Sequence, residues 1–279
     1  MEWGEVIRVT LFLGTGIGLA LWEKAVPRRN GLPDRGWRWS SNLGMVVISA
    51  ILVRFIFPVL PVALAFIVLK NGWGLIPLVG LPFWGEGVLG FVLLDLAIYF
   101  QHRAFHFWRP LWLLHRMHHA DTFYDFTTGV RFHPLEFILS MTFKLILVVV
   151  FGIQPLAVLC FEVVLNCLAM FNHGNIRLPQ RVDEVMRLLV VTPDMHRVHH
   201  STDMREMNQN FGFNLPWWDR LFATYKAQPD LGHEKMVIGL NIFRDKKYRS
   251  LHLMLAMPFI KAGATKLKVE KPEKVEKLE

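Results

Sequence analysis

The sequence PLEFILSMTFKLILVVVFGIQPLAVLCFEVVLNCLAMF, from Pro134 to Phe171, is a long apolar block that is broken near the FGIQP segment at Phe151–Pro155. Each half is about eighteen residues long, which is close to the shortest length with which a helix crosses a bilayer. We therefore predict a helical hairpin that enters the membrane and returns to the same side. Four polar side chains interrupt the block, so the hairpin is expected to face lipid only in part. They are Glu136, Lys144, Glu162 and Asn166.

Three more apolar segments precede this hairpin, at Val6–Trp22, Asn42–Lys70 and Glu86–Phe107. About twenty apolar residues span a bilayer. The second segment is longer than that, so Pro58 and Pro61 are expected to kink or end its helix. The chain has 279 residues, of which 53% are hydrophobic and only 19% are charged. This composition predicts an all-α integral membrane bundle of about three spans plus the hairpin.

Five Lys and Arg residues crowd into the loop Glu23–Ser40. By the positive-inside rule this loop is cytoplasmic and the N-terminus lies outside. Three spans then place both ends of the hairpin on the cytoplasmic face. The formal net charge of +8 gathers in a few loops and the tail, so no nucleic-acid partner is expected. Cys160 and Cys167 lie in an apolar run and are expected to pack in reduced form.

Eight of the twelve histidines fall into three tight clusters, HRAFH, HRMHH and HRVHH. They are His102, His106, His115, His118, His119, His196, His199 and His200. Spacings of three and four bring side chains onto one face of a helix, so each helical cluster would present its imidazoles in one direction. Neutral imidazole is a common ligand of iron, zinc and copper.

Eight imidazoles are too many for one tetrahedral zinc ion and suit a site with two metals. No cysteine lies near the clusters, which excludes a structural Cys/His zinc finger. No His-Glu-x-x-His motif occurs, so a zinc protease of that type is unsupported. On the predicted topology, every cluster lies on the cytoplasmic face, as a helical cap on the bundle.

The order of these clusters and their surroundings resembles the fatty acid hydroxylase and sterol desaturase superfamily of integral-membrane di-iron oxygenases. The resemblance rests on an HxxxH and two HxxHH motifs, with a hydrophobic hairpin between the second and the third. It extends over roughly Gly87–Tyr225 and includes the flanking stretches DLAIYFQHRAFH, RFHPLE, NHGN, TPDMHRVHHS and NQNFGFNLPWWDRLFATY. It implies an N-terminal transmembrane region at residues 1–85, a catalytic domain at 86–228, and a cytoplasmic segment with a charged tail at 229–279.

The resemblance also implies roles for individual residues. The eight clustered histidines would hold two iron ions, and His173 in NHGN would add a ninth ligand where the hairpin returns to the cytoplasmic face. His133 in RFHPLE is open between a ligand, a group that supports a ligand, and a residue at the start of a helix. His233 and His252 lie outside any cluster and are expected to be ordinary surface histidines.

A ligating imidazole usually passes its other N–H to a carboxylate or a carbonyl. Asp95 lies seven residues before His102 on the same helical face, and Asp194 lies two residues before His196. Asp125 is a third candidate. Each of these carboxylates could instead be a helix cap or a surface acid.

The implied reaction is hydroxylation or desaturation of a lipid C–H bond with O2 and two electrons. The lipid would be a sterol, a fatty acyl chain or a related molecule that arrives from the bilayer. No flavin or cytochrome-like segment is evident in the sequence, so electrons would come from a reductase, a ferredoxin, a cytochrome b5-like protein or a reduced pterin. Two other readings stay open: a membrane metal-binding or metal-transport protein, and an inactive relative that serves as a binding module.

Overall fold

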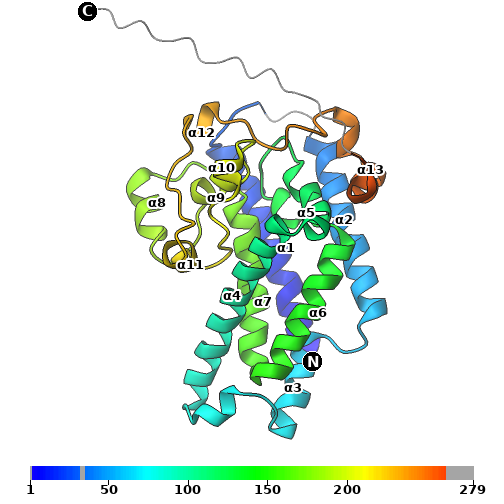
Figure 1. Ribbon diagram of the computed structural model, residues 1–279, viewed down its shortest axis with the longest axis vertical. Helices are drawn as coiled ribbons and strands as arrows, with labels where there is room; N and C mark the ends of the chain where they lie inside the picture. The colour runs from blue at the N-terminus through cyan, green and yellow to red at the C-terminus, as the bar shows by residue number, and fades with distance from the viewer. Residues whose placement is uncertain (1, 32–34, 262–279) are drawn as a thin grey trace, which may run out of the picture.

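The structure is a computed structural model that describes residues 2–31 and 35–261, and the charged tail lies outside the described residues. It is a bundle of long helices with a helical cap at one end (Figure 1). The bundle helices are α1 (Glu2–Ala25), α2 (Arg35–Ile56), α3 (Pro61–Asn71), α4 (Phe83–Phe107), α6 (Pro134–Phe151) and α7 (Pro155–Asn172). The part of the chain that the structure describes contains no strand, only isolated bridges between Pro27 and Ile176 and between Ser201 and Ile238. The all-α prediction is therefore confirmed.

Five segments of the described chain are long and apolar enough to cross a membrane. They are Gly4–Ala25, Arg35–Asn71, Phe83–Phe107, Pro134–Phe151 and Pro155–Asn172. Large apolar side chains such as Phe55, Leu78 and Trp84 are mostly exposed on the bundle, as expected of a surface covered by lipid. This result confirms the three spans plus a hairpin, and the chain is an integral multi-pass membrane protein.

Prolines and glycines divide the apolar segments as the sequence predicts. Helix α2 ends at Ile56 and α3 begins at Pro61, because proline fits the first turn of a helix but interrupts its interior. Helix α6 ends at Phe151, and the capping residue Gly152 adopts the left-handed conformation with φ of 70°. The short α3 lies against the same end of the hairpin, where Ala65 and Val68 join a buried apolar cluster with residues of α6 and α7.

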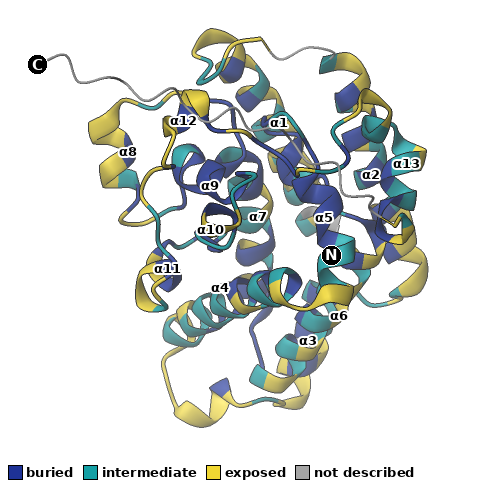
Figure 2. Ribbon diagram, turned by 45° about the horizontal axis from the view of Figure 1, so that its top comes forward, coloured by how far each residue is buried: buried dark blue, intermediate teal, exposed yellow. Residues whose placement is uncertain are grey.

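The cap covers the other end of the bundle, and much of its chain is buried (Figure 2). It holds most of the buried polar residues of the described chain. Its helices are α5 (Arg109–His119), α8 (Gln180–Met186), α9 (Pro193–His199), α10 (Met204–Met207), α11 (Trp217–Leu221), α12 (Gly232–Lys235) and α13 (Leu251–Ala256). Four short 3-10 helices complete the description: η1 (Ile76–Val79) in the loop at the opposite end, and η2 (Thr128–Val130), η3 (Lys246–Arg249) and η4 (Met257–Phe259) on the cap side.

The end of α1 and the start of the basic loop that follows it pack against this cap. The buried carboxylate of Glu23 accepts hydrogen bonds from the backbone N–H groups of Phe126 and Asn175, at 2.8 and 2.9 Å. The guanidinium of Arg28 contacts the Asp194 carboxylate at 3.1 Å. Buried charges are stable only when they are paired or hydrogen-bonded in this way. These contacts fix the basic loop and the histidine clusters on one face of the molecule.

Candidate metal centre

Nine histidines converge where the cap meets the bundle, and they form two groups. In each group the candidate ligand atoms lie within 4.8 Å of one another. The first group contains His102, His106, His115, His119 and His199. The second contains His118, His173, His196 and His200. The structure thus brings together all nine histidines predicted as ligands.

Local helix geometry explains this convergence. Helix α4 carries an i, i+4 pair, α5 an i, i+3, i+4 triplet, and α9 an i, i+3 pair, so each helix turns its imidazoles to one side. Pro193 at the start of α9 and the Thr192 hydroxyl, which accepts a hydrogen bond from the Met195 N–H at 3.4 Å, fix where that helix begins. His173 follows the last residue of α7 and His200 follows the last residue of α9.

The tautomers of two imidazoles in the first group follow from their carbonyl partners. Nδ1 of His102 lies 2.8 Å from the Phe211 carbonyl oxygen, and Nδ1 of His199 lies 2.8 Å from the Gln209 carbonyl oxygen. A carbonyl can only accept, so both Nδ1 atoms carry the proton and both Nε2 atoms present lone pairs. These Nε2 atoms face each other at 3.1 Å. Two lone pairs at that distance repel unless a cation lies beside them.

The second group repeats this arrangement. Nδ1 of His173 donates to the Ala169 carbonyl at 2.7 Å, and Nδ1 of His118 donates to the Arg131 carbonyl at 3.2 Å. Their Nε2 atoms are 3.2 Å apart, and Nε2 of His200 lies 3.1 Å from that of His173. Each group therefore points imidazole lone pairs at a common centre.

Protonation does not offer an easy way to relieve this repulsion. Burial lowers the pKa of His173 and of His199 to about 3, although their carbonyl partners favour the charged form. Burial also lowers the pKa values of His118 and His196 well below the usual range. These side chains are neutral at physiological pH, which is the form that binds metal ions.

Several ring nitrogens fit a metal for a second reason. Within the described residues, both ring nitrogens of His119 and of His196 are buried and have no hydrogen-bond partner. The same holds for Nε2 of His106. Buried polar atoms are rarely left unsatisfied in native proteins. The donor set, all imidazole and thiolate-free, suits iron better than copper(I) or structural zinc.

Glu136 is a functional residue that the sequence analysis treated only as an interruption of the hairpin. Its carboxylate lies 2.7 Å from Nδ1 of His115, whose Nε2 faces that of His102 at 3.2 Å. Glu136 lies in the first turn of α6, directly after His133 and Pro134, and it is buried. The sequence signal that could have predicted this contact is a carboxylate at the start of an apolar helix, next to a histidine-rich cap.

The three aspartates predicted to support ligands contact other groups, so that prediction was wrong. The carboxylate of Asp95 accepts from the Trp218 indole at 2.7 Å and from the Leu215 N–H at 3.3 Å. Asp194 pairs with Arg28 and Arg197, and Asp125 accepts from the Trp39 indole at 2.9 Å. These three carboxylates stabilise the surrounding backbone and cations, whereas carbonyl oxygens accept from four of the imidazoles, those of His102, His118, His173 and His199.

The remaining histidines lie outside both groups. His133 caps α6: its Nδ1 accepts from the Leu135 N–H at 3.2 Å, which is the helix-start role among the three considered. His252 is exposed, as predicted. His233 is only 4% exposed, so its prediction as a surface residue was wrong. It is buried beside the Asp194 carboxylate, 3.6 Å away, within the cluster of charges that joins α12 to α9.

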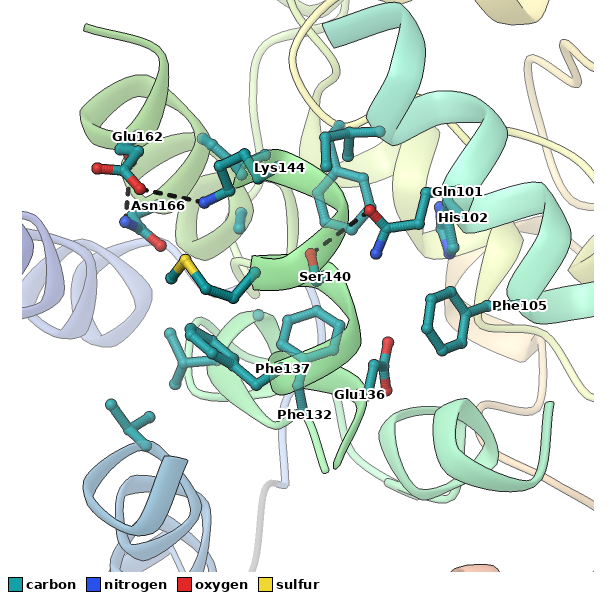
Figure 3. Close-up of a pocket in the computed structure, with 18 of the residues that line it drawn as sticks. Gln101, His102, Phe105, Phe132, Glu136, Phe137, Ser140, Lys144, Glu162 and Asn166 are labelled. Atoms are coloured by element: carbon teal, nitrogen blue, oxygen red, sulfur yellow. Dashed lines mark hydrogen bonds and ion pairs between the residues drawn. The ribbon is translucent and has the colours of Figure 1, made fainter. Parts of the chain in front are cut away.

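A cavity of about 250 Å³ opens onto the first group, between α1, α2, α4, α6 and α7 (Figure 3). His102, His115 and Glu136 lie at one end of it. Its walls are mostly apolar and include Phe105 and Phe132. Apolar cavities with a few convergent polar groups are typical ligand sites.

Five apolar segments of span length and a nine-histidine centre at one end of the bundle define a membrane protein with a candidate metal centre. Residues 87–224 match the family model described as fatty acid hydroxylase. This segment, just under half of the 279 residues, therefore carries the sequence pattern of the fatty acid hydroxylase family. No solved structure matches the chain.

Two relatives illustrate the similarity. An ornithine lipid hydroxylase of Rhizobium tropici is 28% identical over 195 residues, which cover 70% of this chain and 56% of that protein. The alkylglycerol monooxygenase of Homo sapiens is 28% identical over 177 residues, which cover 61% of this chain and 36% of that protein. The chain therefore matches from about one third to just over half of the length of these relatives.

Removal of the Glu136 carboxylate should weaken metal binding without removing a ligand. We expect Glu136→Ala to lower the affinity for iron about 10- to 100-fold, because the His115 imidazole loses the acceptor that orients it. Glu136→Gln keeps an acceptor oxygen and should lose less. Titration of the metal-free protein with Fe²⁺ measures the effect, and Glu184→Gln on the exposed side of α8 is the control. Unchanged iron affinity in Glu136→Ala would contradict this role.

Proposed function

We propose that this protein is a membrane-bound di-iron oxygenase that hydroxylates or desaturates a C–H bond of a lipid, using O2 and electrons from an external donor. The observation that carries the proposal is the pair of histidine groups, each with buried Nε2 lone pairs that face one another at 3.1 to 3.2 Å. Two such groups offer ligands for two cations, five from the first group and four from the second.

Iron bound by these histidines would supply the chemistry that activates O2 for attack on an unactivated C–H bond. The protein's own residues would bind the metals, orient the substrate and exclude water. The carbonyls of Gln209, Phe211, Ala169 and Arg131 hold four of the imidazoles in one tautomer, and Glu136 holds a fifth. Ligands fixed in this way need little rearrangement when a metal binds.

The cavity beside the first group supports a lipid as the substrate. His102 and His115 reach its wall, so a molecule inside it would lie next to the candidate centre. The cavity lies among helices that span the membrane, and an apolar chain could enter from the bilayer. The names of the relatives, a lipid hydroxylase and an alkylglycerol monooxygenase, describe modification of lipids and agree with this proposal. The proposed substrate is a sterol, a fatty acyl lipid or a related lipid, and identification of the oxidised product distinguishes among them.

A metal transporter is the rival function, and the position of the histidines favours the oxygenase. Transport sites lie near the middle of the membrane, between halves of a bundle. Here His102 and His106 lie in the last turns of α4, His173 follows α7, and the other members belong to the cap. The centre is therefore at one end of the bundle.

Loss of a ligand from either group should abolish turnover. We expect the His118→Ala and His199→Ala proteins to insert in the membrane but to form no product, because each substitution removes one imidazole from one of the two histidine groups. The readout is the lipid extract of cells with and without each variant, searched for molecules that gain one oxygen or lose two hydrogens. His252→Ala, an exposed histidine outside both groups, should retain the wild-type product. Formation of product by both variants would contradict the assignment of the two histidine groups as the reacting centre.

We also propose that the centre lies on the cytoplasmic face and receives electrons there from a reductase, a ferredoxin, a cytochrome b5-like protein or a reduced pterin. The support is the basic loop at Glu23–Ser40, which packs on the same face as the histidines. Single cysteines at Lys24 and at Leu78, in a chain freed of Cys160 and Cys167, test the orientation. The cysteine at 24 should resist an impermeant thiol reagent in intact cells, and the one at 78 should react. The reverse pattern would place the centre outside.

A further inference from the structure

The end of the cavity away from the histidines contains charged side chains that the proposed reaction does not use. Arg8 of α1, Lys144 of α6 and Glu162 of α7 meet there, with Asn166 one turn further along α7. We call these four residues the polar cluster. Figure 3 shows Glu162, Lys144 and Asn166 on one side of the cavity and His102 and Phe105 on the other. All four belong to helices that span the membrane.

Two cations in the polar cluster share one carboxylate. Nη1 of Arg8 lies 2.7 Å from Oε2 of Glu162, and Nζ of Lys144 lies 3.2 Å from Oε1 of the same group. The side chains of Lys144 and Glu162 are 10% and 6% exposed. Within the described residues, no second carboxylate lies within ion-pair distance of either cation. The cluster therefore carries one excess positive charge.

An excess charge inside a membrane-spanning bundle is costly, and such residues mark functional sites more often than structural ones. One cation and one carboxylate would suffice to join two helices. The second cation instead lines a cavity that leads to the candidate metal centre. An anionic group bound there would neutralise the cluster and accept charge-assisted hydrogen bonds from Arg8 and Lys144.

The position of the cluster sets how far such a group lies from the histidines. Glu136, the partner of His115, and Lys144 both lie on α6, eight residues apart. At 1.5 Å per residue this separation is about 12 Å along the helix axis. Apolar side chains, among them Phe137 and Met141, line the cavity between the two ends. A ligand that fits has one charged end and an apolar chain that extends toward the centre.

We propose that the polar cluster binds the carboxylate or phosphate group of an anionic lipid substrate, between Arg8 and Lys144, with the apolar chain directed toward His102 and His115. The inference rests on the proposed function for the identity of the histidines as the reacting centre. Arg8 and Lys144 are positioning residues: they determine which carbon of the chain lies beside the histidines, and they do not take part in the reaction.

Equilibrium binding to the purified protein in detergent tests this proposal without turnover. The probes are palmitate, hexadecyl phosphate and methyl palmitate, which share a chain length and differ in their polar end. We expect at least one anionic probe to bind about tenfold or more tightly than methyl palmitate, as a charge-assisted hydrogen bond would give. The anionic probe that binds more tightly distinguishes a carboxylate from a phosphate. Equal binding of all three probes overturns the proposal.

Lys144→Gln and Arg8→Gln should each reduce this preference for the anionic probe about tenfold or more, while methyl palmitate binds as before. Lys70→Gln and Arg54→Gln are the matched controls, because both side chains are exposed on the same bundle. A purely structural cluster would lower the affinity for all probes alike, and that result would contradict the proposal.

Glu162→Gln gives a test of the opposite sign. It removes the carboxylate that the two cations share, so a folded variant should bind the anionic probe more tightly than the wild type. Unchanged or weaker binding in a folded variant counts against the proposal, and the Lys144 and Arg8 variants decide the question if the Glu162→Gln protein does not fold.

Because binding requires neither iron nor O2, equal binding of the probes leaves the di-iron assignment intact. Absence of iron or of an oxidised lipid would defeat that assignment without changing the binding result.

Discussion

The repulsion between buried imidazole lone pairs is the constraint on which the rest of this structure depends. Nε2 atoms of buried histidines face one another at 3.1 to 3.2 Å within each of the two groups. Burial of polar atoms without partners is costly, and a bound cation would make this arrangement favourable. The bundle provides rigid helix ends that hold the imidazoles, and the cap closes over them. The site is therefore fixed by elements that are far apart in the sequence.

The centre depends on backbone as much as on side chains. The carbonyls of Gln209 and Phe211 belong to a segment that Asp219 holds by accepting from the N–H groups of Phe211 and Gly212, at 2.8 and 2.9 Å. Asp95 secures the next part of the same segment through Trp218. Asp95 thus acts one step further out than the sequence suggested, because Asp95 and Asp219 orient the backbone that orients the imidazoles.

The helices and the three histidine clusters were accessible from the sequence because they rest on spacing and length, whereas His173 was proposed only from the family resemblance. Apolar runs of span length, Pro61 at a helix start and histidines three and four residues apart all have a direct geometric meaning. The hydrogen-bond acceptors of the imidazoles were not accessible, because a backbone carbonyl comes from any residue type. The carbonyl of Ala169 gives no signal at all. Gly129 is required nearby, since a Cβ there would lie 2.1 Å from that oxygen, yet its sequence neighbours do not reveal this contact. The contact of the buried His233 side chain with the Asp194 carboxylate also depends on tertiary structure alone.

The iron content of the purified protein tests the central claim most directly. Protein loaded with ⁵⁷Fe under reducing conditions should contain two iron ions per chain. Its Mössbauer spectrum should show high-spin ferrous ions with nitrogen-rich ligation, because the two groups offer nine imidazoles. A single iron per chain, or zinc alone after growth with ample iron, would contradict the account.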